Sequence, residues 1–194
     1  MGGTFDPIHL GHLATAEAVR EIFVLDEILF IPAARPPHKS AKPVTDSRHR
    51  LAMTTLATQS NRFFRVSDIE LKRKGLSYTL DTMNELHATF GATTDLFFII
   101  GADSLVDLSK WHAARELVTK SHFIATTRPG VDVNFSAVEK FFGAPATEHI
   151  HLTTTPGLEI SSTDIRDKVR RRRSIKYLVP DAVEDYIRRE GLYL

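Results

Sequence analysis

The order of apolar and polar positions along the chain predicts short apolar strands that alternate with amphipathic helices. Leu96 to Ile100 is the most hydrophobic run, and because both of its faces are apolar we expect it in the middle of a parallel sheet. Alternating strands and helices indicate an α/β fold, a Rossmann-like doubly wound parallel sheet with flanking helices. The expected strands are 27–32, 63–71, 96–100, 123–126 and 150–152. The expected helices are 10–23, 47–60, 79–90, 113–119, 136–142, one that begins within 161–164 and ends within 170–173, and 181–190.

The start of the chain conflicts with this pattern. A glycine-rich turn of a Rossmann-like fold follows the first strand, which lies at the centre of the sheet, yet only Met1 precedes the turn here. We therefore expect the first strand to be missing or truncated. A start assigned too late would place about five apolar residues, a typical strand length, upstream of Met1; a rearranged N-terminus is the alternative.

Composition narrows the class of protein. The 194 residues suffice for one well-packed domain, and we expect a single domain over 1–194. With 42% hydrophobic and 25% charged residues, a disordered or collagenous chain is excluded. The chain has no cysteine, which excludes disulfides and thiolate metal sites and fits a reducing cytoplasm.

Charge and hydropathy also limit the partners. Lys and Arg number 25 against 24 Asp and Glu, a net charge of +1, so no overall field would attract nucleic acid or an anionic membrane. No apolar run approaches the ~18 residues that a membrane span needs, and no signal peptide is recognisable at the start. We expect a cytoplasmic protein without a nucleic-acid or membrane partner, and a homo-oligomer is open.

The opening residues 2–12, GGTFDPIHLGH, carry the strongest chemical signal. Two glycines let a backbone pass close to a ligand, and Asp6-Pro7 favours a turn. His9 and His12 are three residues apart at the start of a helical pattern, so both imidazoles can face one anion at the helix N-terminus. The motif therefore predicts a phosphate site, although either histidine alone would equally fit an ordinary turn and helix.

A second helix start repeats this chemistry. Ser161 to Asp164 place hydroxyls and an acid where a helix begins, and Arg166 follows about one turn later with a guanidinium that can bind phosphate. Taken alone, this stretch would more often be a simple helix cap. Arg170 to Arg173 is the densest charge run, and its simplest interpretation is a solvated helix C-terminus.

The opening motif resembles the HxGH signature of the nucleotidyltransferase superfamily, and in detail it looks like bacterial nicotinate mononucleotide adenylyltransferases. The resemblance spans nearly the whole chain, because it recurs in PPHK at 36–39, SYT at 77–79, GADS at 101–104, WH at 111–112 and ISSTDIR at 160–166. It implies transfer of an adenylyl group from ATP to nicotinate mononucleotide, giving deamido-NAD and pyrophosphate by direct in-line attack, with Mg²⁺ assistance and no covalent enzyme intermediate.

The resemblance also implies roles for individual residues. Catalysis would rest on cations and hydrogen-bond donors, not on a nucleophile, with Lys39 swinging onto phosphate from a cationic loop. The expected catalytic residues are His9, His12, Lys39 and Arg166. The residues expected to bind ATP are Gly2, Gly3, Thr4, Phe5, His9, His12, Gly101, Asp103, Ile160, Ser161, Ser162, Thr163 and Arg166.

For the mononucleotide, the resemblance implies Lys39, Ser77, Tyr78, Thr79, Trp111 and His112. Trp111 matches the residue that packs on the nicotinate ring, although a lone Trp is more often a core residue. Family members usually carry Tyr after this Trp, so the role of His112 is open. Asp103 follows the strongest strand, where a carboxylate could accept from ribose hydroxyls; a helix cap is the alternative.

Other functions stay in view. Pantetheine-phosphate adenylyltransferase is the nearest rival within the superfamily, and Ser77 to Thr79, Trp111 and the greater chain length argue against it. A nucleotide-binding regulator without catalysis conflicts with the intact His9, His12, Lys39 and Arg166. A nucleic-acid module built on Arg170 to Arg173 lacks aromatic interleaving. The remaining histidines show no spacing typical of a metal site, and we expect no protein-built metal site.

Overall fold

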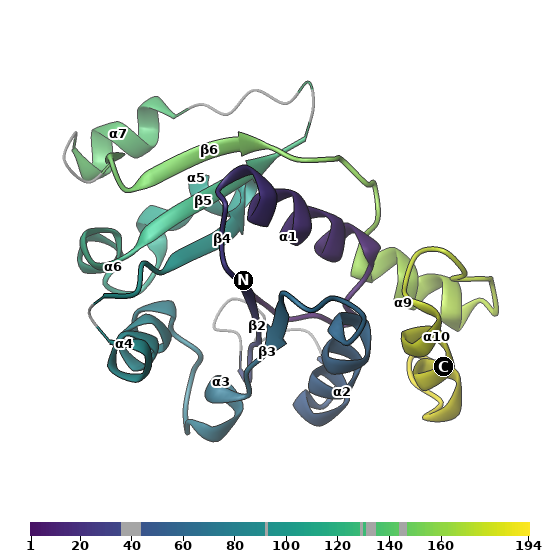
Figure 1. Ribbon diagram of the computed structural model, residues 1–194. Helices are drawn as coiled ribbons and strands as arrows, with labels where there is room; N and C mark the ends of the chain where they lie inside the picture. The colour runs from purple at the N-terminus through teal and green to yellow at the C-terminus, as the bar shows by residue number, and fades with distance from the viewer. Residues whose placement is uncertain (36–43, 92, 129, 131–134, 144–146) are drawn as a thin grey trace.

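The computed structural model describes residues 1–35, 44–91, 93–128, 130, 135–143 and 147–194. Helices and strands alternate along most of the described chain (Figure 1). The strands are β1 Gly2–Gly3, β2 Ile28–Pro32, β3 Phe64–Val66, β4 Phe97–Gly101, β5 His122–Thr127 and β6 Ile150–Thr154. The helices are α1 Leu10–Ile22, α2 Ser47–Thr58, α3 Ile69–Lys72, α4 Thr79–Phe90, α5 Ala102–Val106, η2 Leu108–Lys110, α6 Ala114–Lys120, α7 Ser136–Phe142, α9 Ser162–Arg170 and α10 Asp181–Arg189.

The described strands form two parallel three-stranded sheets, in the orders β1-β2-β3 and β4-β5-β6. β1 and β4 lie next to each other, so the two sheets continue one another with β1 near the centre (Figure 1). This confirms the expected Rossmann-like α/β class. β4 lies between β1 and β5, so the expectation that Leu96 to Ile100 lie in the middle of a parallel sheet is confirmed, although among the described strands β4 forms a hydrogen-bonded pairing with β5 and not with β1.

The first strand is present but short, as expected for a truncated strand. Gly2 and Gly3 pair in parallel with Ile31 and Pro32. Met1 extends this pairing, because its amino group donates to the Leu29 carbonyl at 2.8 Å and its carbonyl accepts from the Ile31 N–H at 3.0 Å. Burial lowers the pKa of this amino group to about 5.

Two element assignments differ from the sequence prediction. The strand expected over 63–71 ends at Val66, and Ile69–Lys72 is a short helix, α3. A run of alternating apolar residues this short does not distinguish the two structures, and the Ser67 hydroxyl accepts the Ile69 N–H at 3.3 Å, which favours the turn into α3. Directly after β4 the chain forms the five-residue helix α5, which is not among the helices expected from the sequence.

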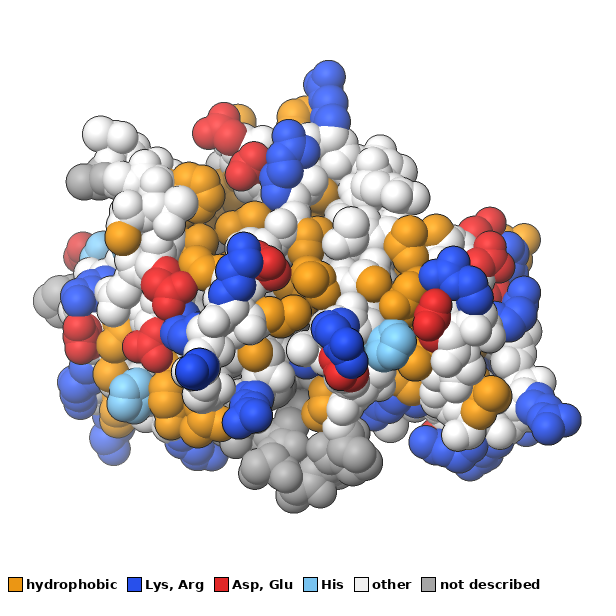
Figure 2. Space-filling model, turned by 90° about the horizontal axis from the view of Figure 1, so that it is seen from below, with side chains coloured by type: hydrophobic (Ala, Val, Ile, Leu, Met, Phe, Trp, Pro, Cys, Tyr) orange, Lys and Arg blue, Asp and Glu red, His pale blue; other side chains and the backbone are white. Residues whose placement is uncertain are grey.

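Acidic and basic side chains are mixed on the surface. On the face in Figure 2, Lys and Arg lie beside Asp and Glu over much of the area, in keeping with the net charge of +1. Within the described part of the chain, no helix is long and apolar enough to cross a membrane.

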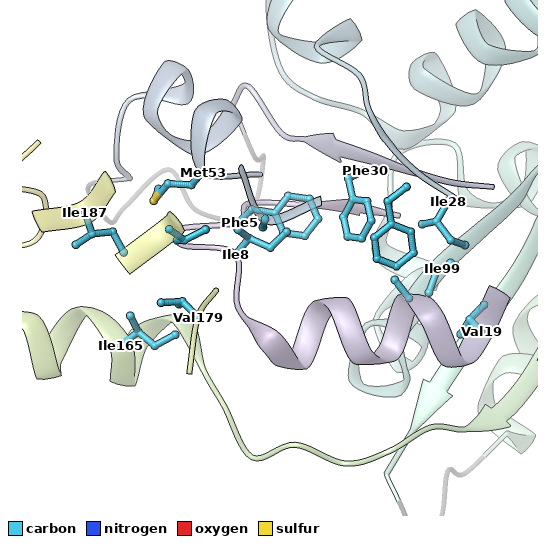
Figure 3. Close-up of a cluster of buried hydrophobic side chains, with 14 of the residues drawn as sticks. Phe5, Ile8, Val19, Ile28, Phe30, Met53, Ile99, Ile165, Val179 and Ile187 are labelled. Atoms are coloured by element: carbon cyan, nitrogen blue, oxygen red, sulfur yellow. The ribbon is translucent and has the colours of Figure 1, made fainter. Parts of the chain in front are cut away.

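The apolar side chains form two clusters on opposite faces of the strands. Successive residues of a strand point to opposite faces, so Ile99 of β4 joins one cluster while Phe98 and Ile100 join the other. Figure 3 shows the first cluster, in which Val19 of α1 lies near Ile28 of β2. Both faces of the sheet are therefore covered by helices, which is why the strands lack an alternation of apolar and polar residues.

A buried arginine connects three loops beneath the start of the chain. Arg50 of α2 is only 1% exposed. Its guanidinium donates to the carbonyls of Thr45 at 2.8 Å, Thr4 at 2.7 Å and Ala34 at 3.3 Å. Burial lowers the pKa of Arg50 from its ordinary value, while the nearby Asp6 carboxylate acts in the opposite direction. The side chain thus holds the segment after β1 against the end of β2.

Arg50→Ala should lower the free energy of unfolding by about 3 kcal/mol or more, because three partly buried carbonyls lose a charged donor and a cavity remains. Urea unfolding measures this change. Arg48→Ala is the matched control on the same helix, since its ion pair with Asp46 is exposed and should contribute less than about 1 kcal/mol. Equal losses in the two variants would contradict the structural role of Arg50.

Candidate active site

One cleft of about 1480 Å³ runs along the carboxyl ends of β4, β5 and β6 and the first turns of α1 and α9. Ligands of doubly wound folds bind at this edge. All of the sequence-predicted site residues that the structure describes line this cleft: Gly2, Gly3, Thr4, Phe5, His9, His12, Ser77, Tyr78, Thr79, Gly101, Asp103, Trp111, His112, Ile160, Ser161, Ser162, Thr163 and Arg166. Lys39 lies outside the described residues.

The first turn of α1 brings the two histidines together. His9 precedes the helix and His12 lies in its first turn, with their rings stacked at a centroid distance of 3.7 Å. A Cβ at Gly11 would lie 3.1 Å from His9 Nδ1, so a side chain at residue 11 would press on the His9 ring and require it to shift. The turn contains no acidic side chain, so the partial positive charge of the helix N-terminus is not neutralised locally.

A hydrogen bond orients the His12 ring. The backbone N–H of His9 donates to His12 Nδ1 at 3.2 Å. In the neutral ring the proton then lies on Nε2, which makes Nε2 a donor. The helix start thus selects the tautomer of His12.

His9 is in a different electrostatic situation. Its side chain is almost fully buried, and this burial lowers its pKa to about 4. The ring is therefore neutral near pH 7. Its Nδ1 has no hydrogen-bond partner among the described residues, an uncommon state for a buried polar atom that a bound ligand could relieve.

The start of α9 is bonded directly to the opening turn. Arg166 Nη1 donates to the Asp6 carbonyl at 2.6 Å, and the Ser162 hydroxyl donates to the Pro7 carbonyl at 2.9 Å. Arg166 Nη2 also donates to the Thr163 hydroxyl at 3.2 Å, and Ser161 caps the helix by accepting the Asp164 N–H at 3.1 Å. Two helix N-termini, α1 and α9, consequently face the same cleft.

The stretch 77–79 is held by the end of β2. The Ser77 hydroxyl accepts the N–H groups of Ala34 at 3.0 Å and Arg35 at 3.2 Å. The N–H of Tyr78 is already used by the Leu76 carbonyl at 3.1 Å. The Thr79 N–H, at the first position of α4, has no acceptor among the described residues, as a helix start leaves its donors open.

Aromatic rings form the wall beside this stretch. The rings of Tyr78 and His112 are tilted by 31° with a centroid distance of 4.4 Å. Trp111 meets Phe98 edge to face at 6.1 Å, and the backbone N–H of Trp111 donates to the Leu108 carbonyl at 3.0 Å. The backbone N–H of His112 has no acceptor among the described residues. Trp111 is half-buried, so it is neither a fully buried core residue nor a fully exposed one.

Gly101 and Asp103 lie at the end of β4. A Cβ at Gly101 would meet no atom within 4 Å, so this part of the cleft is open above the backbone. Gly101, not Asp103, is the residue that caps α5, and Asp103 lies in its first turn. The helix-cap alternative for Asp103 therefore does not describe its position.

The cleft also contains residues that the sequence analysis missed. Arg128 follows the end of β5, and Thr155 to Leu158 follow the end of β6. The rule that ligands bind at the carboxyl ends of parallel strands would have found them, had it been applied to every strand. Glu70 lines the cleft from α3, and burial raises its pKa, although a hydrogen bond from Thr82 at 2.8 Å acts in the opposite direction.

Within the described residues, no group of three or more His, Cys, Asp or Glu side chains could hold a metal ion. Three histidines nevertheless lie together outside the cleft. The ring centroid of His122 is 4.7 Å from that of His149 and 5.8 Å from that of His151. These rings lie near the amino ends of β5 and β6, opposite the edge that forms the cleft.

Comparisons with known proteins show the family of this chain. The family described as cytidylyltransferase-like matches residues 1–168. A protein of Thermoanaerobacter sp. named "Probable nicotinate-nucleotide adenylyltransferase" is 50% identical over all of this chain and 92% of its own length. A protein of the same name from Moorella thermoacetica is 49% identical over all of this chain and 89% of its own length.

A solved structure shares the fold. The nicotinic acid mononucleotide adenylyltransferase of Plasmodium falciparum, complexed with NaAD, superimposes with a TM-score of 0.78 at 24% identity, covering 99% of this chain and 94% of that one. At this identity the likeness shows the fold alone. The curated relatives are far more similar and span the full chain. The protein therefore belongs to the cytidylyltransferase-like family and, within it, to the nicotinate-nucleotide adenylyltransferases.

Proposed function

We propose that the protein transfers the adenylyl group of ATP to nicotinate mononucleotide, giving deamido-NAD and pyrophosphate in NAD biosynthesis. The observation that carries this proposal is the meeting of two helix N-termini, with His9, His12 and Arg166, at one cleft beside an aromatic wall. Donors and a cation suit a triphosphate, and the wall suits a pyridine ring. Family membership supports the same activity.

The transfer needs little covalent chemistry from the protein. A phosphate oxygen of the mononucleotide attacks the α-phosphorus of ATP and forms a new P–O bond. The bond from the α-phosphorus to the oxygen that bridges the α- and β-phosphorus atoms breaks, and pyrophosphate leaves with that oxygen. The enzyme has to align the two phosphates and stabilise charge on the equatorial oxygens and on the leaving group. No nucleophilic side chain and no covalent enzyme intermediate are required.

We assign the phosphates to the two helix starts. His12 donates from Nε2 to oxygens that gain charge during transfer, and the neutral His9 occupies the adjacent position with its partnerless Nδ1. Arg166 supplies positive charge, and its Nη1 donates a hydrogen bond to the Asp6 carbonyl. Lys39 remains a proposed phosphate ligand on the strength of the sequence motif.

We assign the nicotinate carboxylate to backbone N–H groups. Those of Thr79 and His112 have no acceptor in the described structure, whereas those of Tyr78 and Trp111 are occupied. An anionic carboxylate can accept from both, while a carboxamide would turn its own donors towards one of them and leave buried groups unpaired, at a cost of about 1–3 kcal/mol each. The pocket therefore favours nicotinate over nicotinamide mononucleotide, and Asp103 and Gly101 are left for the ribose and adenine end.

Several finer points are part of the proposal. The described residues provide no cluster to hold Mg²⁺, and a Mg²⁺ that arrives with ATP, held by phosphate oxygens and water, needs none; no step is assigned to it. Residues 1–194 act as one domain, since each apolar cluster contains residues of both sheets. A cytoplasmic location and a homo-oligomer stay predictions.

Pyrophosphate release from ATP tests the proposed function directly. The acceptors to compare are nicotinate mononucleotide, nicotinamide mononucleotide and phosphopantetheine. Release should be fastest with nicotinate mononucleotide and absent with phosphopantetheine. ATP binding without release on any acceptor would instead support a non-catalytic nucleotide-binding protein.

His12→Ala should lower kcat roughly a hundredfold, on the scale of one lost preorganised donor, with a much smaller effect on ATP binding. Steady-state kinetics and ATP titration measure the two effects. His87→Ala is the control, because His87 bonds the Lys120 carbonyl away from the cleft and should change neither quantity. An unchanged kcat in His12→Ala would remove this ring from the mechanism.

Trp111→Ala should raise KM for both mononucleotides together, by roughly three- to tenfold, because a shared stacking surface is lost. Lys110→Ala should keep the preference for nicotinate, since Lys110, although it lines the cleft, is paired with Asp107 at 2.6 Å. The measurement is kcat/KM for each mononucleotide. If Lys110→Ala abolishes discrimination, the carboxylate is bound by that cation and not by N–H groups.

His9 should make the protein less stable in mild acid. Its pKa is about 4 when folded against about 6.5 in an unfolded chain. Between these values the unfolded state binds more protons, so stability is unaffected above pH 6.5 and decreases as the pH falls towards 4. His9→Asn should remove a loss on the order of 1–2 kcal/mol between pH 7 and pH 5. An NMR titration of His9 with a pKa near 6.5 would contradict this.

A further inference from the structure

The Asp6 side chain lies outside the roles assigned above, yet it is only 6% exposed. Its Oδ1 accepts the hydroxyl of Tyr193 at 2.8 Å, and its Oδ2 accepts the Thr45 N–H at 3.3 Å. The backbone carbonyl of the same residue accepts from Arg166 at 2.6 Å. Asp6 therefore links Arg166, the proposed phosphate cation, to Tyr193, which lies 187 residues after Asp6 in the sequence.

The turn after α10 places Tyr193 against Asp6. Gly191 adopts a positive φ of 61°, and the Leu192 N–H bonds the Ile187 carbonyl at 3.0 Å while the Gly191 N–H bonds that of Arg188 at 3.3 Å. This is the Schellman arrangement, which ends a helix and reverses the chain. Leu192 and Tyr193 then pack on the apolar cluster that contains Phe5.

The backbone is strained on both sides of the Tyr193–Asp6 hydrogen bond. Tyr193 has a φ of 69°, and Phe5, directly before Asp6, has a φ of 48°. Bulky aromatic residues rarely adopt such left-handed conformations, which persist only where the surroundings hold them. At Asp6 the surroundings include the Tyr193 hydroxyl, and a turn held under strain at a catalytic cleft is a means of fixing geometry.

We propose that Tyr193 is a positioning residue for adenylyl transfer: through the Asp6 carboxylate it fixes the turn to which Arg166 and Ser162 are bonded and from which His9 follows. The proposal rests on the proposed function of this cleft. Tyr193 does not line the cleft and so acts only through Asp6. Burial and the adjacent Asp6 carboxylate raise the pKa of Tyr193 well above its ordinary value, so the hydroxyl stays a donor throughout the working pH range.

Tyr193→Phe removes one hydroxyl and keeps the packed ring. Tyr186→Phe is the matched control, because Tyr186 also loses one hydrogen bond, with His49 Nδ1 at 2.9 Å, and makes no hydrogen bond to the opening turn in the described structure. We expect kcat of Tyr193→Phe to fall roughly tenfold with less than about threefold change in either KM, the pattern of a displaced catalytic group. Tyr186→Phe should keep the wild-type kcat.

Imidazole ¹⁵N NMR gives a readout that does not need activity. In the wild-type protein and in Tyr186→Phe, the His12 signals should show protonation on Nε2, as the hydrogen bond from the His9 N–H requires. In Tyr193→Phe the signals should shift towards a mixture of tautomers as this turn loosens. If the wild-type enzyme proves inactive on every acceptor, the proposed function fails while this spectrum still tests the positioning role.

A double-mutant cycle separates positioning from general stability. If Tyr193 acts through Asp6, combining Tyr193→Phe with Asp6→Asn should lower kcat no more than the worse single variant does. Multiplicative losses in kcat would overturn the proposal, as would a Tyr193→Phe enzyme with wild-type kcat and unchanged His12 signals. Should Tyr193→Phe fold poorly by circular dichroism, Asp6→Asn alone must reproduce both the kcat loss and the His12 shift.

Discussion

The site depends on two hydrogen bonds that join the beginning of the described chain to its last quarter. Arg166 and Ser162, in α9, donate to the carbonyls of Asp6 and Pro7, 160 and 155 residues earlier. These bonds hold the start of α9 against the turn that leads into α1, although the two helices are far apart in the sequence. Because the acceptors are backbone carbonyls, these bonds constrain the course of the turn itself.

Hydrogen bonds from other segments also hold the opening turn in place. Arg50 bonds the Thr4 carbonyl from α2, and the Asp6 carboxylate is occupied by Tyr193 and Thr45. Burying a guanidinium is costly, and the cost is offset only because its donors reach three carbonyls. The pairing of Met1, Gly2 and Gly3 with β2 also holds the residues before this turn.

The electrostatics of the cleft are local and not global. A net charge of +1 provides no long-range attraction for ATP. The first turn of helix α1 contains no acidic side chain, and Arg166 adds a full charge held by a carbonyl and not by a carboxylate. His9 contributes no charge, because burial keeps its ring neutral near pH 7. An anion is thus bound by oriented donors and a few fixed charges, which suits catalysis by positioning.

The sequence by itself determined the class of fold and most of the cleft. Alternating apolar strands and amphipathic helices suffice for an α/β sheet, and the motifs around His9, Ser77, Gly101, Trp111 and Arg166 all proved to line one cleft. Such motifs are readable because helix starts and strand ends use local chemistry. The short helix α3 was mistaken for strand because over four residues the two periodicities are not distinguishable.

Only the tertiary structure decided how those motifs act together. That Asp6 accepts from Tyr193, that Arg50 supports Thr4, and that the free donors near the aromatic wall are the N–H groups of Thr79 and His112 depend on contacts between distant segments. The His9 ring is likewise neutral near pH 7 because it is buried, and no local sequence pattern specifies that burial. The physical reason is that hydrogen-bond partners and desolvation are properties of packed neighbours, whereas sequence periodicity reports only which side of an element faces inward.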